Sequence, residues 1–401
     1  MKILVVCQHY YPEQFLLNEI TAELVRRGHD VTALVGRPNY PEGEVLSDYR
    51  HGRNKFQTVN GVKVVRCFEI GRGSGYFHLA VNYLSYMISA TIKAFFLKGD
   101  FDIVFSYQLS PILMSIPAIV YKRRRRKPVF LYCCDLWPES IKGHLKNSRG
   151  FFYKLVARFS KYVYNTVDVV TVASKPFIKY MRRVNSVPAS NLRYRPQFAS
   201  DIFLKQDLSA EDDGITDFMY AGNLGYEQDL DVIVKAAGLL RNRNDFRVHF
   251  VGFGSYLETL KERVKKEGMD DKIVFHGRVN FDEMGTFYKM ADALLITLRN
   301  ISEIGKTMPA KLQTYMTTGK PIFGAISGAA EEVIKKASCG RTVSAGDYEG
   351  LAELMKDYID HPEKYADCGE NAKCYFKKHF TLASHVDWLE NEFRQLVAGP
   401  R

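Results

Sequence analysis

The chain has 401 residues, of which 46% are hydrophobic and 25% charged. This is the composition of a globular protein, so a largely disordered chain is excluded, and the length is too great for one ordinary core. Residues 1–200 hold 30 Lys and Arg against 13 Asp and Glu, whereas the remainder holds 26 against 32. The strongly cationic first half indicates nucleic acid, an anionic membrane or an anionic ligand as partner, and composition leaves that choice open.

The seven cysteines are odd in number, and no pair has the C-x-x-C spacing of a zinc or redox site. We therefore expect reduced thiols in a cytosolic compartment and no metal. Residues 1–7 form a short apolar run that no long hydrophobic region follows, so they predict a first strand and not a signal peptide.

Short apolar runs alternate with helical patterns along the first half of the chain. Between the first two runs, residues 18–27 have apolar side chains at helical spacing and end at Gly28, a common helix stop. The expected strands are 2–7, 30–35, 62–67, 103–106, 128–133 and 167–173. This alternation predicts a parallel sheet covered by helices on both faces.

The second half restarts the same alternation after a polar, acidic stretch at 195–213. The expected strands are 218–220, 247–251, 273–275, 293–296 and 321–325, and the expected helices are 230–240, 256–267, 282–290 and 310–317. We therefore predict two Rossmann-like doubly wound domains, 1–195 and 200–383. Ligands of such sheets bind outside the carboxyl ends of the strands, so a cleft that the two domains face is the expected active site.

The final helix, about 384–397, has an apolar face made of Trp388, Leu389, Phe393 and Leu396. A terminal helix of this kind docks on a larger body. A return of residues 384–401 to the first domain is one placement for it.

Glycine turns follow two strands of the second half, at 222–225 and 252–254. Such turns let backbone N–H groups approach a phosphate, although a simple tight turn explains each one equally well. Pro309 then opens a helix whose free N–H groups, with Lys311 beside them, form an anion site of the kind a diphosphate needs. A solvated lysine is the alternative there. A further turn at Gly277 and Arg278 suits contact with a nucleotide base or is a surface loop.

Polar and aromatic side chains follow three expected strands of the first half. Asp135 and Glu139 lie just beyond one strand end, where a carboxylate can take a proton from an acceptor hydroxyl, or where Asp135 simply caps a short helix. The other two strands are followed by residues that suit an acceptor site or ordinary loop packing, namely His9, Tyr10, Tyr11, Asn39 and Tyr40.

Two further segments favour a membrane surface. Residues 76–97 are mostly apolar with scattered polar side chains, which indicates a helix that packs on the sheet and dips into a membrane interface, or else an ordinary core helix. Residues 122–127 are six consecutive cations that suit an anionic leaflet, nucleic acid or plain solvation. No zinc-ligand pattern or helix-turn-helix accompanies them, which favours the membrane.

In chain order, these motifs resemble glycosyltransferase family 4, in particular its bacterial branch for capsule and O-antigen assembly with N-acetylfucosaminyltransferase-like members. The segments that carry the resemblance are 24–31, 36–43, 135–140, 221–225, 276–279, 291–292, 309–316 and 319–321. The resemblance implies a GT-B fold, retention of anomeric configuration, and no cofactor beyond a nucleotide-sugar donor, commonly a UDP-sugar. It further implies a polyprenyl-diphosphate-linked saccharide as acceptor and a cytoplasmic, peripheral place at the inner face of the cell membrane.

The same resemblance, read with the motifs above, gives a set of expected site residues. The expected catalytic residues are Asp135, Glu139, Glu303 and Lys311. The expected donor-binding residues are Gly222, Asn223, Gly225, Gly254, Arg278, Val279, Lys306 and Thr314. His9, Tyr10, Tyr11, Asn39 and Tyr40 remain the expected acceptor-binding residues.

The chain departs from the family at positions that matter. The two glutamates of an E-x7-E pattern are replaced by Lys306 and Thr314, with Glu303 as the nearest carboxylate and Arg299 as a further source of charge. Asn223 and Gln228 stand where many members have an Arg and a Lys, and Cys134 stands near a usual histidine. The alternatives are therefore a non-catalytic nucleotide-sugar-binding partner, a nucleotide-sugar epimerase and a basic nucleic-acid binder.

Overall fold

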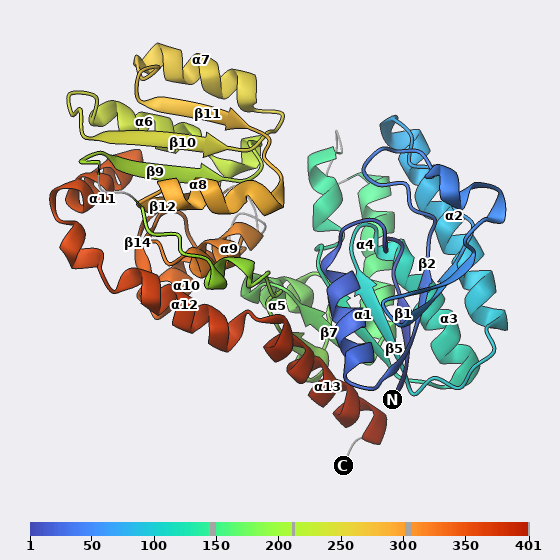
Figure 1. Cartoon of the computed structure of the whole chain (residues 1–401). Coiled ribbons are helices and arrows are strands. Elements are labelled where there is room, and N and C mark those ends of the chain that lie inside the picture. The colour runs from blue at the N-terminus through green and yellow to red at the C-terminus, as the bar shows by residue number, and fades with distance from the viewer. Residues whose placement is uncertain (145–149, 211–212, 301–306, 400–401) are drawn as a thin grey trace. The chain divides into compact units, whose positions relative to one another are not determined.

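The computed structural model describes residues 1–144, 150–210, 213–300 and 307–399. The chain forms two compact units. Unit 1 consists of residues 1–196 and 382–401, and unit 2 of residues 197–381. Each unit has its own mainly parallel sheet with helices packed on it (Figure 1), so the predicted pair of Rossmann-like α/β domains is confirmed.

The sheet of unit 1 has eight strands in the order β3-β4-β2-β1-β5-β6-β7-β8. Their bounds are β1 Lys2–Val6, β2 Asp30–Val35, β3 Phe56–Val59, β4 Val62–Arg66, β5 Ile103–Gln108, β6 Val129–Cys133, β7 Val169–Val172 and β8 Leu192–Tyr194. All neighbours pair in parallel except β3, which runs antiparallel to β4 at the edge. The central strands β5 and β6 are buried along their whole length, as expected of strands covered on both faces.

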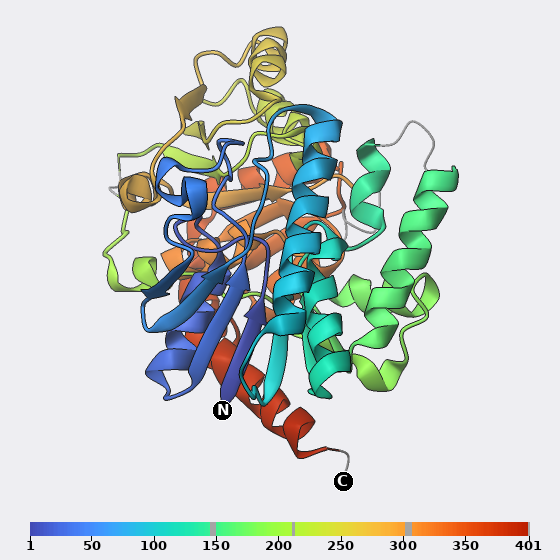
Figure 2. The same ribbon diagram turned by 90° about the vertical axis from the view of Figure 1, so that its right-hand side faces the viewer.

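Helices cover both faces of this sheet. Their bounds are α1 Leu16–Arg26, α2 Gly75–Phe96, α3 Ile116–Arg125, α4 Phe151–Thr166, α5 Lys175–Arg183 and α13 Leu382–Ala398, with a 3-10 helix η3 at Glu139–His144. Figures 1 and 2 show α2 and α3 on one face, while α1 and α13 pack together on the other. Among the described residues, no helix combines the length and apolarity needed to cross a bilayer.

The sheet of unit 2 has six parallel strands in the order β11-β10-β9-β12-β13-β14. Their bounds are β9 Thr216–Ala221, β10 Phe246–Val251, β11 Ile273–Gly277, β12 Ala293–Thr297, β13 Ile322–Ala325 and β14 Gly340–Val343. The helices are α6 Asp231–Leu239, α7 Leu257–Glu267, α8 Met284–Met290, α9 Ala310–Thr318, α10 Ala329–Ala337, α11 Tyr348–Asp360 and α12 Cys368–His379. Because β11, β10 and β9 are neighbours, the turns after them lie at one edge of the sheet.

Candidate functional site

A hollow of about 480 Å³ opens in unit 2 where the turns after β9, β10 and β11 meet the start of α9. Seven of the residues that line it were predicted to bind the donor or to stabilise the leaving diphosphate. These residues are Gly222, Asn223, Gly254, Arg278, Val279, Lys311 and Thr314. Gly225 is not among the residues that line it, and Glu303 and Lys306 lie outside the described residues.

The glycine turns pack against each other through their backbones. Gly222 and Gly252 have φ values of +145° and +144°, and a Cβ atom on Gly252 would lie 1.9 Å from the carbonyl oxygen of Gly222. A Cβ on Gly254 would lie 2.3 Å from the carbonyl oxygen of Leu224. Only glycine fits these approaches, so part of the hollow is lined by bare backbone, which is the surface that phosphates favour.

Lys311 lies in the first turn of α9 and directs its ammonium group toward the end of β9. Its Nζ donates to the Oε1 atom of Gln228 at 2.7 Å, also contacts the hydroxyl of Tyr220, and lies 3.9 Å from the centroid of the Tyr220 ring. Burial of the ammonium lowers the pKa of Lys311 to about 7. Within the described part of the chain, no carboxylate pairs with this lysine. The Lys311 ammonium therefore has no negative partner among the described side chains.

Sequence reasoning did not identify two partners of Lys311 as part of the site. Tyr220 is fully buried, and Gln228 ends the 3-10 helix η6 at Tyr226–Gln228. The only signal for Gln228 was that it replaces a family lysine. Arg299, suggested as a further source of positive charge, is 3.1 Å from Asp229 and 3.5 Å from Asp231. Its charge is thus already balanced by two carboxylates.

The two predicted carboxylates of unit 1 have different surroundings. Glu139 accepts a hydrogen bond from the Tyr180 hydroxyl at 2.9 Å and forms an ion pair with Lys142 at 2.7 Å. Asp135 follows β6, and burial raises its pKa while a hydrogen bond from Ser110 opposes that rise. Among the described residues, no cation pairs with Asp135. Unlike Glu139, Asp135 therefore has no ion-pair partner there.

The predicted acceptor residues follow β1 and β2, which are neighbours in the sheet. Tyr11 and Tyr40 are 44% and 43% exposed, so their rings are available to a ligand. Tyr10 is 2% exposed and hydrogen-bonds through its hydroxyl to Thr21 at 2.7 Å, so its ring belongs to the core of unit 1. His9 and Asn39 are buried beside them.

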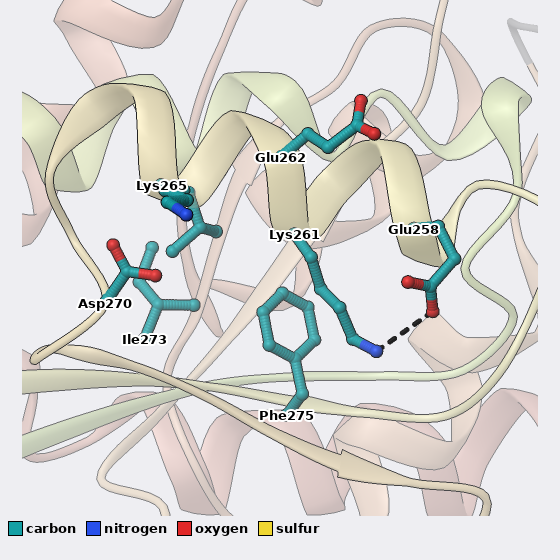
Figure 3. A pocket seen from close by; sticks show the side chains of 8 residues that line it. Glu258, Lys261, Glu262, Lys265, Asp270, Ile273 and Phe275 are labelled. Carbon is teal, nitrogen blue, oxygen red and sulfur yellow. Dashed lines mark hydrogen bonds and ion pairs between the residues drawn. The ribbon is translucent and has the colours of Figure 1, made fainter.

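A second hollow of unit 2, about 450 Å³, lies between α7 and β11 (Figure 3). Glu258 and Lys261 of α7 form an ion pair of 2.9 Å there, and Phe275 of β11 lies below them. Three carboxylates and two lysines line this hollow, so it offers no net positive charge to an anion. None of the predicted site residues lies in it.

Two family models together match most of the chain. A glycosyl transferase 4-like domain matches residues 16–197, and a glycosyl transferases group 1 domain matches residues 204–374. The boundary between the two matches coincides with the boundary between unit 1 and unit 2.

Among curated proteins, WcaI of Escherichia coli K12, named as a colanic acid biosynthesis glycosyl transferase, is 22% identical over 345 residues, which is 80% of this chain and 82% of WcaI. A GDP-mannose-dependent phosphatidylinositol monomannoside mannosyltransferase of Mycolicibacterium smegmatis is 26% identical over 143 residues, so the match spans only 37% of that enzyme.

Two solved structures cover the chain almost completely. Sucrose-phosphate synthase from Thermosynechococcus elongatus has a TM-score of 0.76 at 14% identity, with 100% of both chains covered. HepE from Anabaena, solved in complex with UDP, has a TM-score of 0.72 at 14% identity and covers 98% of this chain and 100% of its own. At such identities the likeness shows the fold. The chain is therefore a glycosyltransferase of the GT-B fold, in which unit 1 is similar to the glycosyl transferase 4-like model and unit 2 to the glycosyl transferases group 1 model.

Proposed function

We propose that the chain transfers a sugar, with retention, from a UDP-sugar to a hydroxyl group of a lipid-linked saccharide during capsule or O-antigen assembly. An N-acetylated amino sugar or a deoxysugar is the proposed donor sugar. The observation that carries the proposal is Lys311, a partly buried cation that no described carboxylate neutralises, beside two turns of bare glycine backbone. A diphosphate supplies the missing negative charge.

In this proposal unit 2 binds the donor. The Lys311 ammonium, the N–H groups at the start of α9 and the turn at Gly222 stabilise the UDP that leaves, an electrostatic role that is largest where water is excluded. Arg278 and Val279 meet the base, and Asn223 and Thr314 contact the diphosphate or the sugar. UDP is favoured because the HepE structure contains it, whereas the mycobacterial relatives are named for GDP-mannose.

Unit 1 binds the acceptor in this proposal. Asp135 is the carboxylate with an uncommitted charge at the end of β6, and it is the candidate to hold the acceptor hydroxyl. Tyr11 and Tyr40 offer exposed rings with an apolar face and a polar hydroxyl, which suits a saccharide. A lipid-linked acceptor requires that unit 1 approach a membrane surface.

A surface of unit 1 suits that requirement. The three helices α2, α3 and α4 contain no Asp or Glu, and most of their exposed side chains are apolar, aromatic or basic. The exposed apolar side chains are Phe77, Leu84, Ile88, Ile92, Phe95 and Phe96 of α2 with Phe151, Phe152 and Leu155 of α4. We call this set, with Arg123 and Arg124 of α3, the apolar–basic surface. It supports peripheral attachment at the inner, anionic face of the cell membrane.

The arginines of the apolar–basic surface contact the apolar helices on both sides. The guanidinium of Arg124 lies 5.0 Å from the ring centroid of Phe95, and that of Arg123 lies 5.7 Å from that of Tyr162. In the described part of the chain neither arginine forms an ion pair with a carboxylate. Their charges are therefore available to anionic headgroups.

The transfer itself is tested with UDP-sugars and an undecaprenyl-diphosphate-linked saccharide. We expect UDP release that depends on the acceptor and a product whose anomeric configuration, read by NMR, equals that of the donor. Lys311→Ala should lower turnover by about a hundredfold or more, since removal of a preorganised stabilising group has that effect. Lys261→Ala, which alters only the hollow of Figure 3, is the matched control. Full turnover in Lys311→Ala, or isomerised donor without acceptor, contradicts the proposal.

A further inference from the structure

Glu13 joins the two loops that carry the predicted acceptor residues. It lies in the segment after β1 and is 5% exposed. Its Oε1 atom accepts hydrogen bonds from the backbone N–H groups of Asn39 at 2.8 Å and Tyr40 at 2.7 Å, both of which follow β2. Its Oε2 atom accepts a hydrogen bond from the backbone N–H of Tyr10 at 3.2 Å. One buried carboxylate thus fixes the spacing of two loops by three backbone contacts.

The same carboxylate orients His9. The Nδ1 atom of His9 lies 3.0 Å from Oε2 of Glu13, and the ring stacks on Phe15 at a centroid distance of 5.2 Å. Because both oxygens of Glu13 already accept hydrogen bonds from N–H groups, the imidazole is the donor in this contact. Donation from Nδ1 leaves the lone pair of Nε2 free in the neutral ring.

The ring of His9 contacts two aromatic side chains, Phe15 and Tyr40, and the Tyr40 ring is exposed. Nε2 makes no hydrogen bond to the described residues, and it is not one of their enclosed unpaired atoms. The ring of Tyr40 meets His9 edge-on at a centroid distance of 5.8 Å and is itself 43% exposed. If a saccharide packs on Tyr40, one of its hydroxyl groups can donate a hydrogen bond to Nε2.

We infer that Glu13 is a positioning residue for the acceptor: it holds the loops after β1 and β2 in register and sets His9 so that Nε2 accepts a hydrogen bond from an acceptor hydroxyl. This inference rests on the proposed function, because it takes these loops as part of the acceptor site. It adds a residue to that site and assigns one nitrogen of His9 a defined role.

The test uses the full chain with Glu13→Gln, His9→Gln and the double variant. The glutamine amide places N–H donors against backbone N–H donors, so some of the hydrogen bonds that hold the two loops at a fixed spacing are lost. We expect KM for the lipid-linked acceptor to rise about ten- to a hundredfold in Glu13→Gln, because hydrogen bonds to a buried charged group are lost. UDP binding, which belongs to unit 2, should stay unchanged. The double variant should be no worse than the poorer single variant, since both changes break the same arrangement.

A second readout does not depend on turnover. Hydrogen exchange of the Asn39 and Tyr40 amides should quicken together in Glu13→Gln, whereas Glu23→Gln, a carboxylate of α1 that pairs with Arg26 and Arg27, should leave them protected. Where Glu13→Gln does not fold, His9→Gln alone still tests the hydrogen bond to the acceptor. An unchanged acceptor KM in folded variants, or additive losses in the double variant, overturns the inference. Absence of transfer by the unaltered chain overturns the proposed function instead, and amide exchange then decides the role of Glu13 in holding the loops.

Discussion

At the residue scale, Lys311 links structure to proton binding. A lysine ordinarily has a pKa of 10.5, and burial lowers that of Lys311 to about 7. Near neutral pH the empty site therefore holds this lysine partly uncharged, and a diphosphate beside Nζ would raise its pKa again. Donor binding and proton uptake are then one coupled event.

Nucleotide affinity should fall as pH rises above about 7, since the bound state keeps a proton that the empty state releases. The loss approaches tenfold per pH unit until the pKa of the bound state is reached. Calorimetric titration of UDP between pH 6 and pH 9, in two buffers of different ionisation enthalpy, measures both the affinity and the proton uptake. Lys311→Met should remove the pH dependence. A flat profile in the unaltered chain would show that Lys311 does not meet the diphosphate.

The same lowered pKa affects the stability of the empty protein. The unfolded chain binds the lysine proton more tightly than the folded chain, so this group makes the free energy of unfolding rise with pH between about 7 and 10.5. Denaturant unfolding without nucleotide, compared between the unaltered chain and Lys311→Met, isolates this contribution. Parallel curves over that range contradict it.

The close approach of the two glycine turns gives a further residue-scale prediction. Gly252→Ala places a methyl group 1.9 Å from the Gly222 carbonyl oxygen, so the two turns must separate and nucleotide binding should be lost. Gly268→Ala is the matched control, because Gly268 also has a positive φ, +64°, but nothing lies within 4 Å of its added Cβ. The control should cost about 1 kcal/mol of stability and keep its affinity for UDP in the same titration. Equal affinities in both variants would contradict the role of the turns.

Some residues of the candidate site could be predicted from the sequence and others could not. The sequence predicted that Gly222, Gly254 and Lys311 would lie at one site, and they do line one hollow, because glycine turns and helix starts have local signals. Glu13, Tyr220 and Gln228 were not predicted, because each makes at least one of its contacts with a residue distant in the sequence. A local pattern does not specify which of the many polar residues meets a given partner after folding.

At the element scale, the strongest local patterns were the reliable ones. The runs that form β1, β2, β5 and β6 are rich in buried β-branched or aromatic residues, and the sequence predicted them within about one or two residues. The strands β3, β8 and β14 and the helices α3, α4, α5, α10, α11 and α12 were not predicted. In β3 the residues are exposed or half-buried, so the strand depends on its pairing with β4 and has no apolar run of its own.

The three acid-free helices give a prediction at the same scale. Replacing Arg123 and Arg124 by serine should weaken binding to vesicles rich in phosphatidylglycerol by about 2 kcal/mol, close to a thirtyfold loss, because each basic residue near an anionic surface contributes about 1 kcal/mol. Ile88→Ser with Ile92→Ser should weaken binding to the same vesicles independently, since both side chains are more than half exposed. Sedimentation with vesicles measures both effects.

The matched control for the membrane experiment removes two lysines from unit 2, Lys261→Ser with Lys265→Ser, which changes the net charge equally on a different surface. This variant should sediment with anionic vesicles as the unaltered chain does. Equal losses in the control and in the arginine variant would indicate an effect of overall charge and would remove the apolar–basic surface from the proposal.

At the scale of the whole molecule, the last helix completes the first unit. Phe393 of α13 lies 5.4 Å from the ring of Phe105 and 5.2 Å from that of Phe130, on β5 and β6. Glu390 of the same helix contacts His29 at 2.5 Å, and Glu392 contacts Arg193 at 3.1 Å. The sequence indicated an apolar face for this helix, but it did not decide which body the face would meet.

Phe393→Ala should therefore lower the free energy of unfolding of unit 1 by about 3–5 kcal/mol, as expected for removal of a buried phenylalanine. Denaturant unfolding followed by the tryptophans, both of which belong to unit 1, reports this loss. Val397→Ala, at a side chain 42% exposed on the same helix, should change stability little. UDP binding should survive in both variants, and an unfolding curve of Phe393→Ala that matches the unaltered chain would contradict the packing.

The return of α13 also sets an order of events during synthesis. Unit 2 is one continuous stretch, residues 197–381, so the ribosome makes all of it between the first segment of unit 1 and α13. Unit 1 begins first but waits for α13, which is made only after the whole of unit 2. Phe105 and Phe130 thus remain uncovered on the nascent chain during elongation, where chaperones that bind exposed aromatic surface would find them. The amino-terminal unit is translated first and completed last.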